Sequence, residues 1–255
     1  MKVSIITVAY NSAATIADTV RSVMAQTYDD IEYIVVDGNS RDNTLEVLEP
    51  YREFIDQLVS EPDKGLYDAM NKGIRMATGD IVGILNSDDF FTSNDVVESV
   101  VNAFRQDASL EAVYADLHFV KEPDLKTNVR YFSSKMFAPW LFRFGFMPAH
   151  PTFYVKRDCY NRYGYYDQSL RIAADYELLL RFIYCKRIKC KYIHKDLVTM
   201  RLGGVSTANV HSRWDGCKEE VKACLQNGVY TNMCMILLKY FYKILGLRWW
   251  THFKK

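Results

Sequence analysis

The stretch IVGILNSDD, residues 81–89, is the most informative feature of this chain. Its first five residues, Ile81 to Leu85, form the kind of short apolar run that a buried strand shows. Two adjacent acids, Asp88 and Asp89, follow where that strand should end. Two carboxylates side by side in a crevice repel each other unless a cation lies between them, and a divalent metal that also binds a diphosphate would serve. The alternative is that these acids serve only to cap a helix expected from Val96.

Composition indicates one globular domain with a C-terminal appendage. The chain has 255 residues, of which 49% are hydrophobic and 25% charged, and its net charge of +1 gives no sign of a nucleic-acid partner. The charge is uneven, because no acidic residue follows Glu220 while six basic ones do. Met1 and Lys2 lead directly into an apolar strand without the features of a signal peptide, so we expect a cytoplasmic protein. Six cysteines without a C-x-x-C pair argue against structural zinc and against disulfides.

The first hundred residues alternate between strand and helix patterns. Strands are expected at residues 3–8, 31–36, 57–60 and 81–85, and amphipathic helices at 12–24, 44–54 and 66–77. This alternation predicts an α/β fold, with a doubly wound and mostly parallel central sheet flanked by helices. Ligands of such sheets bind beyond the carboxyl ends of the strands. We therefore expect one crevice to collect the polar residues at those ends, namely Tyr10, Asn11, Asp37, Asp63, Asp88 and Asp89.

The second half of the chain is less regular. Strands are expected at 112–119, 128–132, 152–155 and 191–200, helices at 157–163 and 174–184, and an aromatic loop at 139–148. We predict a main domain over residues 1–227. It would comprise a nucleotide-binding half at 1–110 and an acceptor-binding half at 111–227, followed by an amphipathic, basic and aromatic helix at 228–255.

Several motifs resemble those of a known family, the inverting family 2 glycosyltransferases with the GT-A fold, and in particular enzymes that build bacterial surface polysaccharides. The resemblance rests on these stretches: 3–11, 35–44, 62–65, 71–73, 77–80 and 86–89, with weaker matches at 148–154, 174–177 and 203–206. It implies transfer of a sugar from a nucleotide-diphosphate donor.

The resemblance assigns the nucleotide to the first half of the chain. Tyr10 and Asn11 would form a wall for the base, and Asp37 would accept a hydrogen bond from a ring N–H, most plausibly of uracil. Asp63 would approach the base or ribose, and Asn71 and Lys72 would close over the nucleotide. The alternatives are ordinary packing for Tyr10, a turn or helix cap for Asp37, and a solvated helix face for Lys72.

Asp88 and Asp89 match the metal motif of the family. The resemblance assigns direct coordination to Asp89, and either the ribose or the metal to Asp88. Asn86 stands where many relatives carry another Asp, which leaves that division open. Mg²⁺ or Mn²⁺ is the expected cofactor, because both favour carboxylate and phosphate oxygens and would neutralise charge on the leaving diphosphate.

Inversion at the sugar carbon requires a base that takes the proton of the acceptor hydroxyl. Asp175 matches the family's base, although Ala174 replaces the Glu that usually precedes it, and Glu177 is the fallback. The alternative for Asp175 is a helix cap. His150 lies where the family presents residues to the acceptor, or else is a packed neutral histidine.

The glycine-containing loop at 203–207 is the last segment to which the resemblance gives a role. It would close over the donor, with Arg201 and Ser206 near the phosphates, unless its two glycines only make a turn.

The tail combines apolar, aromatic and basic residues. Lys239 and Lys243 are four apart and would share a helix face, which is typical of an interfacial helix on anionic lipid. We therefore expect peripheral attachment to the inner face of the cell membrane and an acceptor carried on a polyprenyl diphosphate. The alternative is a helix that docks on the domain or on a second copy, as in a homodimer.

The predicted function is metal-dependent, inverting transfer of a sugar from a nucleotide-diphosphate sugar, with a UDP-sugar as the expected donor, to a hydroxyl of a lipid-linked saccharide in cell-surface polysaccharide biosynthesis. One alternative is a sugar-phosphate nucleotidyltransferase, although the loop after the first strand lacks the Gly-rich, basic character of that class. The other is a non-catalytic carbohydrate-binding protein of the same fold. The sequence identifies neither the sugar nor the acceptor nor the linkage.

Overall fold

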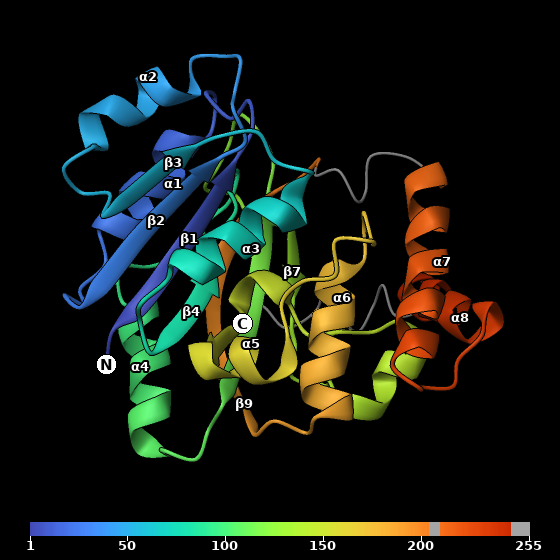
Figure 1. Cartoon of the computed structure of the whole chain (residues 1–255). Coiled ribbons are helices and arrows are strands. Elements are labelled where there is room, and N and C mark those ends of the chain that lie inside the picture. Colours follow the sequence, from blue (N-terminus) through green and yellow to red (C-terminus); the bar gives the residue numbers. More distant parts are fainter. Residues whose placement is uncertain (204–209, 246–255) are drawn as a thin grey trace.

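A single curled sheet organises the chain (Figure 1). The structure is a computed structural model, and it describes residues 1–203 and 210–245. Within them the strand order is β3-β2-β1-β4-β8-β6-β9-β5, with β7 paired to β6. The strand bounds are β1 (Val3–Ala9), β2 (Ile31–Asp37), β3 (Gln57–Ser60), β4 (Ile81–Ile84), β5 (Phe90–Phe91), β6 (Ala112–Val120), β7 (Arg130–Phe132), β8 (Tyr154–Lys156) and β9 (Cys190–Arg201).

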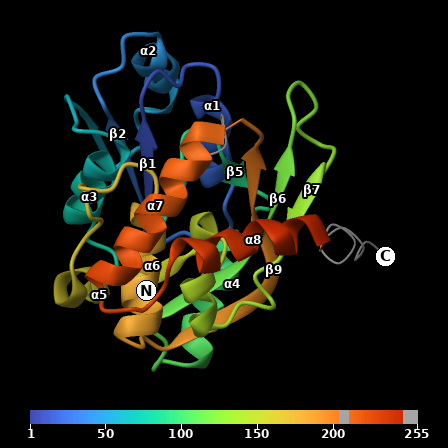
Figure 2. The same ribbon diagram turned by 90° about the vertical axis from the view of Figure 1, so that its right-hand side faces the viewer.

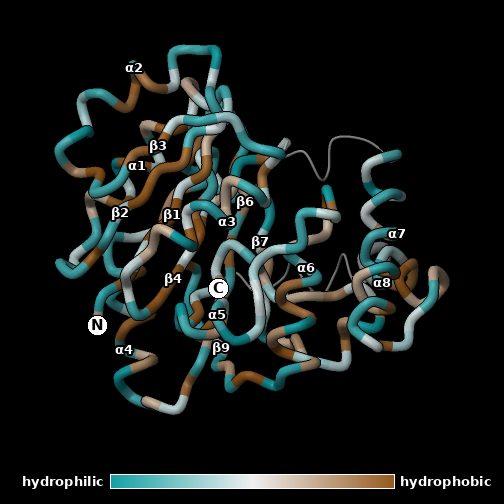
Figure 3. The backbone as a smooth tube through the Cα atoms, in the orientation of Figure 1, coloured by the Kyte–Doolittle hydropathy of each residue, from teal (hydrophilic) through white to brown (hydrophobic). Residues whose placement is uncertain are grey.

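The first half of the sheet is parallel, as the alternation of the sequence predicts. β1 pairs in parallel with β2 and with β4, and β2 pairs in parallel with β3. Side chains of β1 alternate between two cores: Ile6 and Val8 face one, while Val3 and Ile5 face the other. Both faces are buried, which explains why these strands are continuous apolar runs, drawn brown in Figure 3.

The second half of the sheet is mixed. β8 lies antiparallel between β4 and β6, and β6 pairs in parallel with β9. Gly83 of β4 lies opposite Tyr154 of β8, and a Cβ at Gly83 would lie 2.2 Å from the tyrosine ring. Glycine is therefore required there, because the ring occupies the space of a side chain. The sheet runs without a break across the predicted boundary at residue 110.

Helices cover both faces of the sheet. α3 packs on β1 and β2, and α1 and α4 bury their apolar sides in the opposite core (Figure 1). The bounds are α1 (Ile16–Met24), α2 (Thr44–Leu48), α3 (Leu66–Met76), α4 (Val96–Gln106), α5 (Arg157–Tyr163), α6 (Ala174–Leu179), α7 (Val210–Gln226) and α8 (Met233–Leu245). Short 3₁₀ turns are η1 (Glu49–Tyr51), η2 (Pro139–Phe144) and η3 (His150–Thr152), and η4 (Leu180–Cys185) is a π-helical continuation of α6.

Several elements differ from the sequence prediction, and β5 and α7 have no counterpart in it. The helix expected at 44–54 is α-helical only to Leu48 and continues as η1, since Pro50 has no N–H to donate. The aromatic segment 139–148 contains a 3₁₀ helix rather than only a loop. The helix from Ala174 changes to π geometry at Leu180, a feature that periodicity does not reveal.

The C-terminal helix docks on the domain. α8 packs against α7 and η2 (Figure 2), and Ile236 is fully buried. Lys239, expected to face lipid, is only 6% exposed, and its Nζ lies 2.6 Å from Oε1 of Glu220 on α7. This corrects the prediction of a basic lipid-facing stripe through Lys239, and favours docking on the domain for this part of the tail. The side chain of Lys243 and all residues from 246 onward lie outside the described residues. No helix in the described ranges is both long enough and apolar enough to cross a bilayer.

Candidate active site

The carboxyl ends of the parallel strands lie level with one another. Ala9 at the end of β1 pairs with Asp37 at the end of β2, and Asp37 pairs with Ser60 at the end of β3. β4 lies on the other side of β1, and the residues after Ile84 leave it at the same edge. The predicted polar residues at these strand ends therefore do share one edge of the sheet.

Tyr10, Gly38 and Asp63 form an open wall at this edge. A Cβ on Gly38 would lie 2.2 Å from Oδ2 of Asp63 and 3.5 Å from Cδ2 of Tyr10, so both side chains lie directly over the glycine. Tyr10 is 57% exposed and is not a packed core residue. Asn11 adopts φ 50°, and its Oδ1 accepts a hydrogen bond from the backbone N–H of Arg41 at 2.8 Å. The Tyr10 ring is therefore largely exposed, while Asp63 is half-buried and its Oδ1 accepts a hydrogen bond from the Gly65 N–H at 2.8 Å.

Asp37 directly precedes Gly38 of this wall and is fully buried. Its Oδ2 accepts hydrogen bonds from the Ser40 N–H at 3.0 Å and from Oγ of Ser60 at 2.6 Å, and its Oδ1 accepts from Oγ of Ser40. The turn-forming alternative is therefore realised. In this structure the Asp37 carboxylate fixes the loop after β2 through these three hydrogen bonds.

The two acids after β4 have different environments. Asp89 is fully buried, whereas Asp88 is partly exposed. Burial, and then the neighbouring Asp88 charge, raise the pKa of Asp89 well above its ordinary value. Thr19 holds the turn by donating to the Asp89 carbonyl at 2.7 Å. Such a carboxylate is costly to ionise unless a cation reaches it.

The oxygens at this turn fit a hard divalent cation. Oδ1 of Asp89 and Oδ1 of Asn86 are buried polar atoms to which no described residue donates a hydrogen bond. In residues 1–203 and 210–245, no three Asp, Glu, His or Cys side chains group closely enough to hold a metal by themselves. One or two carboxylates completed by phosphate oxygens is the usual arrangement for Mg²⁺. Asn86, which replaces the family's Asp, still offers an oxygen here.

The turn is tied to its neighbours on two sides. Oγ of Ser87 lies 2.8 Å from Oγ of Ser12, in the loop that follows β1 and carries Tyr10. Arg201 at the end of β9 donates from Nη1 to the Asp88 carbonyl at 2.7 Å and from Nε to Glu122 at 2.8 Å, and it also pairs with Asp18. Arg201 is 7% exposed, so in this structure it stabilises the Asp88–Asp89 turn as a buried residue. Ser206 lies outside the described residues.

Asn71 and Lys72 hold protein segments in place in this structure. The Asn71 amide exchanges two hydrogen bonds of 2.9 Å with the backbone of Tyr166, and the residue is 1% exposed. Lys72 donates to the Pro62 carbonyl at 2.8 Å and pairs with Glu61 at 2.9 Å. Lys72 is thus not a free solvated lysine, since it fixes the loop that presents Asp63.

Asp175 and His150 meet in a small pocket at the end of β4. Nδ1 of His150 lies 3.2 Å from Oδ2 of Asp175, and both residues line a cavity with Ile84, Phe153 and Tyr166. Ile84 is the last residue of β4, and Asp88, the first residue of the acidic turn Asp88–Asp89, lies four positions further along the chain. Asp175 is therefore not a simple cap: the side chain is directed into a pocket that adjoins the strand edge. The histidine is not isolated in the core either, since 35% of its side chain is exposed.

Two contacts that the sequence did not suggest hold the segment that leads into Asp175. Glu219 on α7 accepts hydrogen bonds from the backbone N–H groups of Arg171, Ile172 and Ala173 at 2.8–3.1 Å, just before α6 begins. Tyr67 on α3 donates to the Ile172 carbonyl at 2.8 Å. Burial, and then the Asp175 charge, raise the pKa of Tyr67. Nothing in the sequence around Glu219 indicates that its carboxylate accepts hydrogen bonds from backbone N–H groups 46 to 48 residues earlier in the chain.

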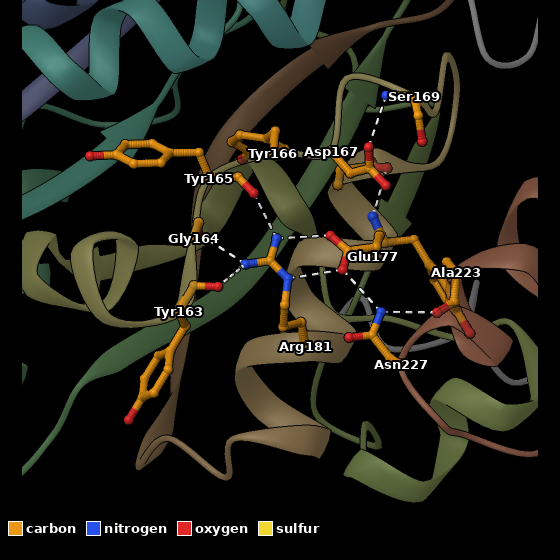
Figure 4. Close-up of polar contacts among 12 residues, drawn as sticks. Tyr163, Gly164, Tyr165, Tyr166, Asp167, Ser169, Glu177, Arg181, Ala223 and Asn227 are labelled. Carbon is orange, nitrogen blue, oxygen red and sulfur yellow. Dashed lines mark hydrogen bonds and ion pairs between the residues drawn. The ribbon is translucent and has the colours of Figure 1, made fainter.

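The contacts of Glu177 argue against it as the fallback base. Its Oε2 pairs with Nη2 of Arg181 at 2.8 Å, and its Oε1 accepts from Nε of Arg181 at 2.9 Å and from Asn227 at 3.0 Å (Figure 4). Arg181 also donates to the carbonyls of Gly164 and Tyr165. Glu177 is 5% exposed and belongs to a structural network that holds the 163–166 loop and the end of α7 to α6.

Comparison with known proteins gives the family. The family model described as glycosyl transferase family 2 matches residues 4–177. An uncharacterized glycosyltransferase of Mycobacterium tuberculosis is 30% identical over 210 residues, which cover 79% of this chain and 76% of that protein. A PGL/p-HBAD biosynthesis glycosyltransferase of Mycobacterium bovis is 26% identical over 211 residues, covering 81% and 80%. These matches favour sugar transfer over the nucleotidyltransferase alternative.

Solved structures show the same fold. Staphylococcus aureus TarS 1–349 in complex with UDP-GlcNAc aligns with a TM-score of 0.69 at 17% identity, covering 99% of this chain and 77% of that one. The mannosyltransferase PcManGT of Pyrobaculum calidifontis, in complex with GDP-Man and Mn²⁺, aligns with a TM-score of 0.66 at 20% identity, covering 97% and 71%. With its α/β sheet, strand-edge site and family match, the chain belongs to glycosyl transferase family 2, and it is a glycosyltransferase with the GT-A fold.

Proposed function

We propose that this glycosyltransferase moves a sugar, with inversion, from a nucleoside-diphosphate sugar to a hydroxyl of a lipid-linked saccharide, and that it depends on Mg²⁺ or Mn²⁺. A uridine nucleotide is the proposed donor. The observation that carries the proposal is the shared strand edge: Tyr10 and Asp63 lie on one side of the acidic turn, and the His150–Asp175 pocket lies on the other. Donor, leaving group and acceptor would then occupy successive parts of one edge.

On the donor side, the base would stack on Tyr10, with Asp63 as hydrogen-bond acceptor. Asp89 would bind the cation together with Asp88 and Asn86, and Oδ1 of Asp89 and Oδ1 of Asn86 are buried and otherwise unsatisfied. When bound, the metal supplies positive charge beside the departing diphosphate. The proposed nucleotide-sugar and metal have parallels in the UDP-GlcNAc complex of TarS and the GDP-Man and Mn²⁺ complex of PcManGT.

On the acceptor side, the carboxylate of Asp175 would assist removal of the proton from the attacking hydroxyl. Inversion requires that this group face the sugar carbon from the side opposite the diphosphate. The position of Asp175 is determined by three elements, α3, α6 and α7, through Tyr67, its own helix and Glu219. A carboxylate held in this way suits a reaction that depends on positioning.

The acceptor proposal is a saccharide on a polyprenyl diphosphate, used in cell-surface polysaccharide or glycolipid assembly at the inner face of the membrane. Support comes from the mycobacterial relative named for PGL/p-HBAD biosynthesis and from the excess of basic residues after Glu220. Peripheral contact with anionic lipid would be visible as co-sedimentation with phosphatidylglycerol vesicles at low salt. A homodimer through the tail would instead give a doubled mass in light scattering without vesicle binding.

Ligand-induced stabilisation tests the donor and metal assignment. The melting temperature of the full chain is measured with UDP, GDP and their common sugars, with and without Mn²⁺. We expect a uridine nucleotide to raise the melting temperature only when Mn²⁺ is present, since a ligand that binds the folded form alone stabilises it. Asp89→Ala should remove that increase, whereas Glu53→Ala, an exposed acid away from the strand edge, should keep it. Equal stabilisation with and without metal would contradict the metal dependence.

A further inference from the structure

A cavity separate from the strand edge is formed by β6, the segment that leads into η2, and the end of η4. Its volume is about 510 Å³, which is in the range of small-molecule binding sites. Three aromatic rings and two isoleucines form most of its wall, namely Tyr114, Phe137, Tyr184, Ile183 and Ile188. None of them lines the pocket of Asp175. The cavity is therefore a second concave surface, to which the proposed donor and metal residues do not contribute.

The aromatic wall of the cavity is packed against its neighbours. The Tyr114 ring lies edge-on to Phe137, with 5.7 Å between the ring centroids, and it stacks on Tyr192 at 5.8 Å. Phe137 in turn lies edge-on to the buried ring of Phe142 at 5.2 Å. These contacts hold the rings in place before any ligand arrives. An apolar chain that enters the cavity would therefore bury its surface against a preformed wall.

Large apolar side chains are exposed beside the cavity. Phe137 and Pro139 line it, and their neighbours in the chain, Met136 and Trp140, are 72% and 57% exposed. A methionine and a tryptophan that remain open to solvent next to an apolar cavity extend the apolar surface outward. Such an extension suits a ligand that is too long to be enclosed, as a lipid chain is.

One cation lines this mostly apolar cavity. Arg187 is exposed, and within the described residues its guanidinium forms neither an ion pair nor a hydrogen bond. Its φ of 54° is left-handed, and it directly follows Lys186, the C-cap of η4. Glycine is the usual residue at such a helix end, and any other residue adopts this conformation at an energetic cost. The guanidinium is thus available for an anion, and phosphate oxygens match its donors well.

The cavity and the pocket of Asp175 lie along one helix. Leu179 at the end of α6 lines the pocket, and Ile183 of η4, one helical turn further on, lines the cavity. At the rise of an α-helix, Arg187 lies no more than roughly 18 Å beyond Asp175 along this segment. A saccharide between a phosphate at Arg187 and a reacting hydroxyl at Asp175 would span that separation.

From these observations we propose that the cavity binds an isoprenoid diphosphate, with the apolar chain against the aromatic wall and the diphosphate on Arg187. This inference rests on the proposed function, because it specifies how the lipid part of the acceptor is bound. The saccharide extends from Arg187 along α6 towards Asp175. Binding at this site is non-covalent, and the reacting bonds remain at the strand edge.

Binding of farnesyl diphosphate to the full chain tests the site, with farnesol and pyrophosphate as the two halves of the probe. Isothermal titration calorimetry is carried out without a divalent cation, so that the acidic turn does not attract the diphosphate through a metal. We expect saturable binding of farnesyl diphosphate, tighter than that of either half by about tenfold or more, since both the chain and the charged group contribute. Asp89→Ala should bind the probe as the unaltered chain does.

Arg187→Gly is the decisive variant, because it removes the cation and places glycine at the positive φ. The melting temperature should stay the same or rise, while the affinity for farnesyl diphosphate falls by about tenfold or more and that for farnesol does not change. A residue with only a structural role would not give this combination. Lys186→Gln, a neighbouring exposed cation that does not line the cavity, is the matched control and should keep the affinity.

The chain-binding wall is tested by Tyr184→Ser, which should weaken farnesyl diphosphate and farnesol alike and leave pyrophosphate unaffected. Absence of farnesyl diphosphate binding, or equal affinity in Arg187→Gly and the unaltered chain, would overturn the inference. So would pyrophosphate that binds as tightly as the whole probe, because the site would then recognise a simple anion.

Failure of the inference is distinguishable from failure of the proposed function. If Asp89→Ala abolishes binding of the probe, the diphosphate binds at the acidic turn, and the inference fails while the donor assignment stands. If no nucleotide sugar raises the melting temperature with Mn²⁺ but farnesyl diphosphate still binds through Arg187, the proposed donor function fails and the lipid site is supported.

Discussion

Nδ1 of His150 lies 3.2 Å from Oδ2 of Asp175, although the two residues belong to different elements, η3 and α6. The contact joins the segment that follows the aromatic 3₁₀ helix to the helix tied by Glu219 to α7. It places an imidazole and a carboxylate at the end of β4, next to the acidic turn. The proposed acceptor side of the site is therefore built from segments of the second half of the chain, and the proposed donor side from the first.

Glu219→Gln tests whether α7 positions Asp175. The carboxylate accepts three consecutive backbone N–H groups ahead of α6, and an amide retains one oxygen but presents donors where acceptors are needed. We expect kcat to fall by up to about 100-fold through displacement of Asp175, since small misplacements of a catalytic group are that costly. The donor KM should not change. Steady-state kinetics provide the test, and Lys218→Gln, the neighbouring exposed residue, is the control. Unchanged kcat in Glu219→Gln would show that the hydrogen bonds of Glu219 affect stability alone.

Glu177→Gln tests the exclusion of the fallback base. The substitution removes a charge that pairs with Arg181 in a mostly buried network, and we expect a loss of about 2 kcal/mol in the free energy of unfolding. Chemical denaturation measures that loss. The kcat of the folded fraction should stay close to wild type, because Glu177 is engaged by Arg181 and Asn227 and does not line the pocket of Asp175. A kcat as low as that of Asp175→Asn would return Glu177 to the reaction.

Acid stability depends on Glu32. Burial alone would raise its pKa, but hydrogen bonds from Ser4, Thr78 and Lys2 outweigh burial and lower it from 4.5 to about 2. A lowered pKa stabilises the folded protein above the unfolded value, and that contribution is lost as the pH falls from 4.5 towards 2. The shift corresponds to about 3 kcal/mol. We expect Glu32→Gln to lower the free energy of unfolding by that order at pH 7 and to converge with wild type near pH 2.

Urea unfolding at a series of pH values measures this effect. Glu53→Gln, at an exposed site, should follow the wild-type curve throughout. A constant difference between Glu32→Gln and wild type from pH 7 to pH 2 would contradict the assignment to Glu32.

Lys239→Ala tests the docking of α8. Removing the ammonium group deletes its ion pair with Glu220, in which the two side chains are only 8% and 15% exposed, at a cost of about 3 kcal/mol. Calorimetric melting should therefore shift to lower temperature, while co-sedimentation with anionic vesicles should be the same as for wild type. Weaker vesicle binding with unchanged stability would mean that Lys239 faces lipid after all.

Sequence patterns predicted the donor half better than the acceptor half, for physical reasons. The runs at 3–8, 31–36 and 81–85 are buried on both faces, so their burial is visible as continuous apolar sequence, and parallel pairing then places Asp63 and Asp89 at one edge. Contacts between distant polar side chains leave no such pattern. The engagement of Asp37 by Ser60 and the burial of Lys239 against Glu220 depend on tertiary packing alone.

Glu177 illustrates what sequence reasoning could not distinguish. At the sequence level it is an acid in the first turn of a helix, equivalent in kind to Asp175. The π-helical continuation and the 163–166 loop bring Arg181 to it, and neither is encoded by a periodic pattern. His150 was recognised as a site residue, but its pairing with Asp175 required the fold.

The most direct measurement of the central claim is Mn²⁺-supported nucleotide release from a sugar donor by wild type, Asp89→Ala and Asp175→Asn. The account predicts that each variant loses at least about 100-fold in kcat, and that only Asp89→Ala also loses the stabilisation by nucleotide with Mn²⁺. Wild-type release rates in Asp89→Ala, or equal dependence on Mn²⁺ in all three proteins, would contradict it.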